Sequence, residues 1–466
     1  MPSKGVSARA QQQALLSGLA HQHLIDADTR RLLDRAEREA PDEPKAANLR
    51  ETRRAYDRAV KVPTALVKTI AQASAIAKDA WAKARETSDF ARFAPHLTQL
   101  IDLKRKVAEC VGYEHEPYDA LLDEYEPGVR AADLAELFAR LRRETVDLLD
   151  RVRRSSTKPD TSILRRSYPT DGQARFGRKL AEAVGFDFTA GRCDVSVHPF
   201  CSTIGGPGDV RITTRYDEAF LPAALFGTLH EVGHALYEQG LPSEHTFTPL
   251  GEAVSLGVHE SQSRMWENLV GRSRAFWSFH FAELSETFPS ALAGVTLDDF
   301  VAAVNAVEPS LIRVEADELT YNLHIIVRFE LERAMFCGAL AVDDVPAAWN
   351  EKMGETVGVV PPTDGRGCLQ DIHWSLGAFG YFPTYALGNL YAAQFFAQAR
   401  ADIPDLIERI ERNDHRALRD WLRANIHRHG QRYRADELVR RVTGRPLSIE
   451  PFMTYIREKV SPLYGL

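Results

Sequence analysis

The chain has 466 residues, of which 44% are hydrophobic and 26% are charged, a composition typical of a soluble globular protein with a large core. Its net charge of -7 argues against a nucleic-acid-binding protein. The first 20 residues lack the apolar segment of a signal peptide, and no run of 18 apolar residues occurs. We therefore expect a cytoplasmic protein with no membrane partner.

The cysteines are odd in number, scattered, and never arranged as a C-x-x-C pair. They are Cys110, Cys193, Cys201, Cys337 and Cys368. This pattern favours neither a disulfide framework nor a thiolate metal site, and most of these residues are expected to be small buried hydrophobes.

Residues 10–110 carry apolar side chains three and four positions apart, with charged residues between them. The spacing predicts several long helices packed as hairpins, and a lid or a dimer contact is the alternative role for this region. A helical pattern resumes at residues 130–154. The first third of the chain is therefore expected to be helical.

Between residues 192 and 216 the pattern changes from helical to twofold alternation. Residues 193–200 and 209–216 alternate, and the turn-forming residues 202–208 separate them. This predicts a small antiparallel β-sheet just before the next helix. The sheet has two equally open roles: a purely structural hairpin, or an edge at which a peptide pairs through its backbone.

The segment 221–240 predicts an apolar helix that carries the sequence H-E-x-x-H. His230 and His234 are four residues apart, so both imidazoles project from one face of the helix, while Glu231 points about a quarter-turn away. Burying these groups without partners costs several kcal/mol, roughly 2 or more for each polar group. This spacing lets two neutral imidazoles bind one zinc ion and leaves the Glu231 carboxylate to act as a base toward water.

A catalytic zinc site needs a third protein ligand, because such sites bind three side chains and keep one position open. The extended motif with a further histidine is absent, since Tyr237 stands where a glycine would be required. The next predicted helix offers Glu252, Glu260 and Glu267 as candidates. Glu260 lies in the middle of that helix, where a rigid backbone can aim it; an exposed ion pair with Arg264 is its alternative role.

Residues 311–334 are predicted to form one helix with two polar stripes. By 100 degrees per residue, one stripe is made by Arg313, Asp317, His324 and Arg328. One stripe can face solvent, so the second suggests a face turned toward an internal groove; an unusually polar amphipathic helix is the alternative.

Residues 352–391 are rich in glycine and aromatic residues. His373, Tyr381 and Tyr385 in this segment can donate hydrogen bonds to a developing oxyanion. Core packing is the alternative role of such an aromatic cluster.

Taken together, these residues resemble the M32 family of metallocarboxypeptidases, the carboxypeptidase Taq type. Six family motifs occur in order and without departure, over residues 198 to 374. They are His198-Pro199-Phe200, Asp209-x-Arg211-x-Thr213, His230-Glu231-x-x-His234, His259-Glu260-Ser261-Gln262, Ile312-Arg313-x-x-Ala316-Asp317, and Gly367-x-x-Gln370-Asp371-x-His373-Trp374.

The resemblance implies one peptidase domain over residues 1–466, mostly α-helical and bilobal, similar to neurolysin and angiotensin-converting enzyme. A long substrate groove would lie between two helical lobes, with residues 1–110 as an N-terminal helical lid or hairpin region. The resemblance also implies Glu260 as the third metal ligand, zinc or cobalt as the metal, and a homodimer. The implied activity is the release of single residues from peptide C-termini with broad specificity.

We expect Glu231 to accept the proton of the attacking water and pass it to the leaving amine, and His373 and Tyr385 to stabilise the oxyanion.

A free terminal carboxylate needs a cation to recognise it, and Arg313 is the first candidate because a guanidinium binds a carboxylate through two parallel hydrogen bonds. Arg211 is the second candidate. Asp317 is expected to support the anchoring arginine, and His198 and Tyr381 complete the predicted substrate-binding residues.

Two alternatives stay open. A dipeptidyl carboxypeptidase or an oligoendopeptidase on the same fold would use the same zinc chemistry in another register. A catalytically inactive helical scaffold would keep the metal as structure, but the intact Glu231 argues against it, because a structural site needs no general base.

Overall fold

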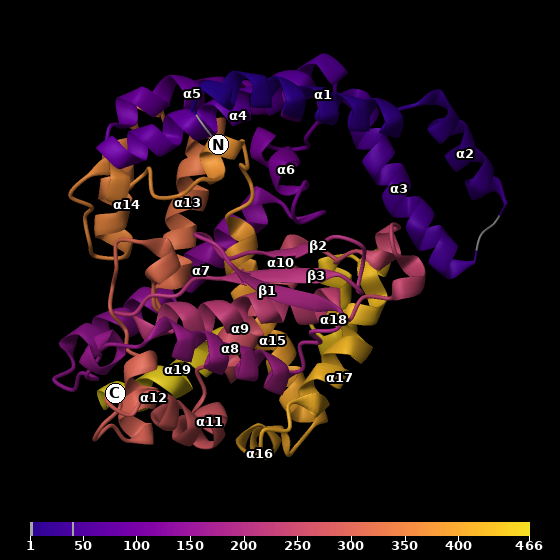
Figure 1. The fold of residues 1–466 in the computed structure, drawn as a ribbon. Helices are drawn as coiled ribbons and strands as arrows, with labels where there is room; N and C mark the ends of the chain where they lie inside the picture. The colour runs from indigo at the N-terminus through magenta and orange to yellow at the C-terminus, as the bar shows by residue number, and fades with distance from the viewer. Residues whose placement is uncertain (1–2, 40–41) are drawn as a thin grey trace. The chain divides into compact units, whose positions relative to one another are not determined.

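The computed structural model describes residues 3–39 and 42–466, so residues 1–2 and 40–41 of the predicted N-terminal helical region lie outside the described residues. The chain divides into two compact units that are each built from several segments. The first unit contains residues 1–146, 308–316 and 320–383, and the second contains residues 147–307, 317–319 and 384–466. Both units are mostly helical, which confirms the predicted fold class (Figure 1).

The first unit is built around long antiparallel helices, among which α1, α4 and α5 lie side by side (Figure 1). Its helices are α1 (Val6–Leu24), α2 (Ala27–Arg38), α3 (Glu43–Lys61), α4 (Thr64–Thr87), α5 (Phe90–Val111), α6 (Pro117–Leu122), α7 (Ala131–Arg154) up to Val146, α13 (Tyr321–Phe336) and α14 (Val345–Thr356). Short 3-10 helices span Ser3–Gly5, Arg313–Glu315, Val342–Asp344, Asp364–Arg366 and His373–Leu376.

Aspartates begin three of these helices. The side chains of Asp26, Asp42 and Asp89 each accept a hydrogen bond from a backbone N–H in the first turn, at 2.8, 3.2 and 3.4 Å. Such caps satisfy N–H groups that have no partner inside the helix, and each contributes about 1 kcal/mol. The caps at Asp26 and Asp42 contribute to the stability of α2 and α3, because each of these two helices buries few side chains.

The prediction of one helix over residues 311–334 is wrong. The α-helix begins only at Tyr321, and Arg313 lies in the separate 3-10 turn Arg313–Glu315. Before the helix, the Asp317 carboxylate accepts a hydrogen bond from the N–H of Leu319 at 2.9 Å. Asp competes with helix formation through such local bonds, so Arg313 and Asp317 do not share a helical face with His324 and Arg328.

The second unit contains a small sheet and the remaining helices. The helices are the end of α7, α8 (Thr170–Val184), α9 (Leu221–Glu238), α10 (Leu256–Arg264), α11 (Arg274–Thr287), α12 (Leu297–Val304), α15 (Pro383–Asp402) from Thr384 on, α16 (Leu406–Glu411), α17 (Arg416–Asn425), α18 (Ala435–Thr443) and α19 (Glu450–Tyr464). A π-helix, Met265–Val270, continues α10, and 3-10 helices span Ser162–Arg165, Ser243–His245, Pro249–Gly251 and His427–Arg432.

The predicted sheet exists, but it is mixed and not antiparallel. Its strands are β1 (Gly191–Val195), β2 (Cys201–Thr203) and β3 (Val210–Thr214), in the order β1-β3-β2. The two segments expected to pair do pair, as β1 and β3, but they run parallel. The reason is that part of the segment expected to be only a turn forms β2, which pairs antiparallel with β3 and reverses the chain a second time.

One face of this sheet lies on α9, the helix that carries the H-E-x-x-H sequence (Figure 1). Ile212 of β3 is fully buried, and the hydroxyl of Thr214 contacts that of Thr228 in α9 at 2.9 Å. Arg192 and Arg211 pair across β1 and β3 one residue before Cys193 and Ile212, so they point to the opposite face.

None of the helices in residues 3–39 and 42–466 has the length and apolar character that a membrane span requires.

Candidate metal centre

Two glycines allow the elements of this site to approach closely. A Cβ atom on Gly233 would lie 2.5 Å from the Cα of Ser263, so any side chain there would push α9 and α10 apart. A Cβ atom on Gly388 of α15 would lie 2.4 Å from Cγ of Glu260. Ser255 begins α10 by accepting a hydrogen bond from the N–H of Val258 at 3.1 Å, which places Glu260 in the second turn.

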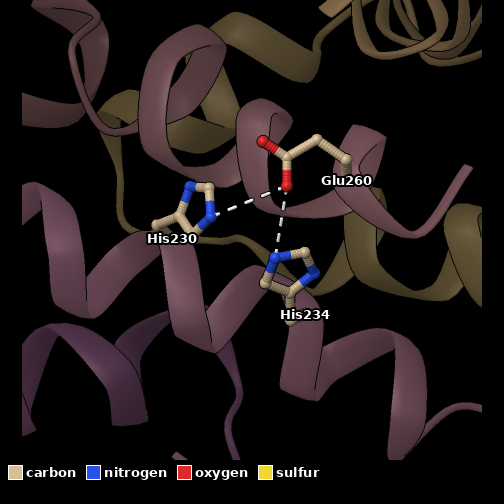
Figure 2. Close-up of side chains that lie close together, drawn as sticks. All are labelled: His230, His234 and Glu260. Carbon is tan, nitrogen blue, oxygen red and sulfur yellow. Dashed lines mark ion pairs between the residues drawn. The ribbon is translucent and has the colours of Figure 1, made fainter. Parts of the chain in front are cut away.

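His230, His234 and Glu260 converge. Ligand atoms of the three side chains all lie within 4.8 Å of one another. In the described part of the chain, these three residues form the group of His, Cys, Asp or Glu side chains that meets this distance. Oε2 of Glu260 is 3.7 Å from Nε2 of His230 and 3.3 Å from Nε2 of His234. Figure 2 shows the carboxylate pointing toward both imidazoles, which come from adjacent turns of α9. Two imidazole nitrogens and one carboxylate oxygen form the ligand set of a catalytic zinc site.

Glu260 is held by its own helix. Nε of Arg264 donates to Oε1 at 2.7 Å, and the hydroxyl of Ser263 donates to Oε2 at 3.1 Å. Burial raises the pKa of the Glu260 carboxyl, but the charge of Arg264 and the two nearby imidazoles outweigh this effect and hold its pKa well below the usual range. The ion pair with Arg264 that the sequence suggested therefore exists, but it is buried and supports the carboxylate at the site.

Glu267, another candidate third ligand, contacts the other side of His230. Its Oε2 lies 2.8 Å from Nδ1 of His230, the ring nitrogen that faces away from the Glu260 contact. Arg264 and Arg272 pair with the same carboxylate at 3.2 and 3.6 Å. A carboxylate on the second nitrogen fixes the orientation and tautomer of a metal-binding imidazole. The remaining candidate, Glu252, is exposed and lies outside the converging group.

A second chain of hydrogen-bonded polar side chains approaches His234, and its residues were not among those predicted from the sequence. Nδ1 of His234 lies 2.6 Å from Nδ1 of His259, whose Nε2 lies 2.8 Å from Oε1 of Glu238. The hydroxyl of Thr203 in β2 donates to Oε2 of Glu238 at 2.6 Å. The only sequence signal for this chain is the position of His259 inside the His259-Glu260-Ser261-Gln262 motif.

Glu231 is buried beside these ligands. Burial raises the pKa of its carboxyl to about 7, and the neighbouring Glu260 adds to this effect. Within residues 3–39 and 42–466 its side chain makes neither a hydrogen bond nor an ion pair. A carboxylate in this state is suited to accept a proton near neutral pH.

The first unit holds a buried charge cluster that joins Arg313 and Asp371, from two of the six motifs, to Tyr321 and Arg328 of α13. Nε and NH2 of Arg313 both donate to Oδ1 of Asp371, at 3.0 and 2.8 Å, and NH1 donates to the hydroxyl of Tyr321 at 2.9 Å. Arg328 donates from Nε to Oδ2 of the same carboxylate at 2.7 Å. The side-chain oxygen of Gln370 accepts the backbone N–H of Arg313 at 2.8 Å.

This cluster contains two guanidinium groups that share one carboxylate. Burial raises the pKa of Asp371, but Arg313 and Arg328 outweigh it and keep the pKa well below its usual range. Arg328 is fully buried, and among the described residues its NH2 group has no hydrogen-bond partner.

The other predicted site residues lie on several different elements. Arg211 pairs with Asp209 at 2.8 Å on the sheet face that points away from α9. His198 is exposed between β1 and β2. The His373 ring lies 5.2 Å from that of Tyr381 in the first unit, whereas Tyr385 lies on α15 in the second unit.

The family model for carboxypeptidase Taq (M32) metallopeptidases matches residues 1–460. The chain belongs to the M32 family. This confirms the resemblance drawn from the six motifs, and this M32 chain is therefore a metallocarboxypeptidase.

Relatives of this metallocarboxypeptidase agree in sequence and in fold. Thermostable carboxypeptidase 1 of Thermus thermophilus is 51% identical over 478 residues, covering 100% of this chain and 93% of the relative. Carboxypeptidase 1 of Bacillus subtilis is 41% identical, covering 93% and 86%. The crystal structure of an M32 carboxypeptidase from Deinococcus radiodurans R1 is 42% identical, with a TM-score of 0.95 and coverage of 100% and 94%.

Proposed function

We propose that this M32 peptidase is a zinc-dependent carboxypeptidase that removes single residues from peptide C-termini with broad specificity. Cobalt is proposed as an alternative metal. One observation carries the proposal: two imidazoles and a carboxylate converge beside Glu231, a buried carboxylate with no partner in the described part of the chain. A purely structural metal site would have no use for Glu231.

The donor set fits a divalent cation. His230, His234 and Glu260 would hold it, and the Arg264 contact leaves Oε2 of Glu260 as the oxygen directed at the imidazoles. A divalent cation in such a site supplies Lewis acidity to a carbonyl and lowers the pKa of water.

Glu231 is the proposed general base. Its carboxylate accepts the proton of the attacking water, and the resulting carboxylic acid donates that proton to the leaving amine. Burial supports this role, because a carboxyl whose pKa is raised to about 7 exchanges protons readily at neutral pH.

His373 and Tyr385 are proposed to donate hydrogen bonds to the oxyanion. Burial lowers the pKa of His373 to about 3, so its imidazole is neutral and carries one N–H donor. Losing one such donor would cost about 2.7 to 4 kcal/mol in the transition state.

Arg313 is the proposed anchor for the substrate's terminal carboxylate. Its own fork binds Asp371, and the support for the role is that a second guanidinium, that of Arg328, shares this carboxylate. Arg211 stays the second candidate, although its guanidinium is paired with Asp209.

Asp317, His198 and Tyr381 are proposed to support substrate binding, as the motifs they belong to or adjoin suggest. A homodimer is proposed from the family resemblance alone, and a cytoplasmic location is kept as a proposal from the sequence.

Mass spectrometry of a peptide panel tests this function. Metal-loaded enzyme should produce ladders shortened by one residue at a time from the C-terminus, and chelated enzyme should produce none. Amidated peptides should resist. Loss of dipeptides would support a dipeptidyl carboxypeptidase, internal cleavage indifferent to amidation would support an oligoendopeptidase, and metal binding without turnover would support an inactive scaffold.

A further inference from the structure

The two imidazoles of the candidate metal centre have different hydrogen-bond partners at Nδ1, the ring nitrogen that faces away from Glu260. His230 contacts the Glu267 carboxylate directly, at 2.8 Å. His234 contacts a second imidazole, that of His259, at 2.6 Å, and His259 in turn contacts the Glu238 carboxylate at 2.8 Å. His234 therefore reaches its carboxylate through a second imidazole.

The chemistry of imidazole dictates how protons are arranged along this chain. A His234 that presents the lone pair of Nε2 toward the Glu260 side carries its single proton on Nδ1. That proton can only be donated to Nδ1 of His259, which must then be an acceptor. His259 consequently carries its own proton on Nε2 and donates it to Oε1 of Glu238.

The far end of this hydrogen-bond chain, at Glu238, is also fixed. The second oxygen of Glu238, Oε2, accepts the hydroxyl of Thr203 at 2.6 Å, and Thr203 is the last residue of the edge strand β2. Glu238 is the last residue of α9, one turn beyond His234. Because burial is outweighed by the contacts with His259 and Thr203, the pKa of Glu238 is lowered and the residue is a carboxylate at neutral pH.

We propose that His259 and Glu238 are positioning residues: together they fix the tautomer and the ring orientation of His234 and thereby set the metal affinity of the site. This inference rests on the proposed function only in treating His234 as a metal ligand. Removal of such outer partners typically lowers metal affinity about 10- to 100-fold. The same hydrogen-bond chain connects the site to β2, because Thr203 of β2 donates to Glu238.

Packing is the competing explanation for His259. Its ring lies 5.4 Å from that of Tyr237, so it could simply fill space. Two substitutions separate the explanations. His259→Phe keeps an aromatic ring against Tyr237 but removes both hydrogen bonds, whereas His259→Gln changes the shape but keeps one acceptor and one donor.

The measurement is the dissociation constant for Zn²⁺, determined by competition with a chelator on the full chain. We expect His259→Phe to bind Zn²⁺ about 10- to 100-fold more weakly than wild type, and His259→Gln to recover much of that loss. The d–d absorption of Co²⁺-loaded enzyme should shift in His259→Phe and stay near wild type in His259→Gln. Equal affinity in wild type and a folded His259→Phe would overturn the proposal.

Glu238 gives a second test if His259→Phe does not fold. Glu238→Ala removes the acceptor at the end of the chain and should weaken Zn²⁺ binding, while Glu238→Gln keeps a carbonyl acceptor and should weaken it less. Glu252→Ala, at an exposed glutamate, is the matched control and should bind as wild type does. Wild-type affinity in Glu238→Ala would overturn the proposal.

These affinities are measured without turnover, so they separate this inference from the proposed function. A wild-type protein that binds Zn²⁺ but releases no C-terminal residue would contradict the function alone. Unchanged affinities in the His259 and Glu238 variants of an active enzyme would contradict the positioning roles alone.

Discussion

Arg264 and Glu260 form a buried pair on successive turns of α10, with Nε of the arginine 2.7 Å from Oε1 of the carboxylate. The same arginine contacts Glu267, the partner of His230, at 3.2 Å. One side chain therefore supports both the candidate ligand carboxylate and the carboxylate that orients a candidate ligand imidazole. This arrangement leaves Oε2 of Glu260 as the oxygen directed toward His230 and His234.

The first prediction concerns Glu260. Glu260→Gln and Glu260→Ala should weaken metal binding, because each removes the anionic oxygen that converges with the two imidazoles. Metal content after dialysis and chelator competition measure the effect. Glu252→Ala is the control and should keep its metal. If the control loses its metal and the Glu260 variants keep theirs, the third ligand has been misassigned.

The second prediction concerns Glu231. Glu231→Gln preserves the shape of the side chain but removes the base, so kcat should fall by about two to four orders of magnitude. Metal binding should stay stoichiometric, since Glu231 is not part of the converging group. Metal analysis and steady-state kinetics on the same preparation test both statements. A kcat close to wild type would rule out Glu231 as the general base.

The third prediction concerns Arg313. Arg313→Lys keeps the charge but loses the planar fork, so kcat/KM on free peptides should fall clearly. Arg313→Ala should lose more, about one to two orders of magnitude, because a hydrogen bond to a charged group contributes roughly 1.5 to 3 kcal/mol. Steady-state kinetics at one pH and at saturating metal measure these losses.

Amidated peptides are the control for Arg313, because no terminal carboxylate remains to be recognised. The loss on amidated peptides should be far smaller than the loss on free ones. Arg313 also holds Asp371, so a purely structural role is the alternative. Equal losses on both substrates would indicate that structural role and make Arg211 the leading anchor.

The fourth prediction concerns stability in acid. His415 is buried against Trp266 and Phe276, and neither of its ring nitrogens has a hydrogen-bond partner among the described residues. Burial lowers its pKa from 6.5 to about 4, with a smaller contribution from His280. The unfolded chain therefore binds more protons between these pH values, and His415 destabilises the fold progressively as the pH falls from 6.5 to 4.

Replacing His415 should remove this effect. The difference between the two pKa values corresponds to roughly 3 kcal/mol once both states are protonated. In calorimetric scans between pH 7 and pH 4.5, the Tm of His415→Phe should therefore fall less than the Tm of wild type. The exposed His23→Phe is the control and should follow wild type. Identical pH profiles for His415→Phe and wild type would contradict the prediction.

The sequence by itself determined the features that depend on spacing within one element. His230 and His234 are four residues apart on an apolar helix, so their convergence follows from helix geometry alone. The mostly helical fold class and the family also followed, because apolar periodicity and the six ordered motifs are local properties of the chain. The limits of local reasoning show at residues 311–334, where a continuous pattern concealed the break before Tyr321.

Only the tertiary structure decided the features that depend on packing between distant segments. Periodicity could not choose among Glu252, Glu260 and Glu267, because the choice depends on how closely α9 and α10 approach at Gly233. The parallel pairing of β1 and β3 depended on the short strand β2, which carries too few residues for a period to be recognised. The contact between His259 and Glu238 joins two helices, and that between Arg313 and Asp371 spans 58 residues. Such contacts are set by the packing of whole elements, which no local pattern records.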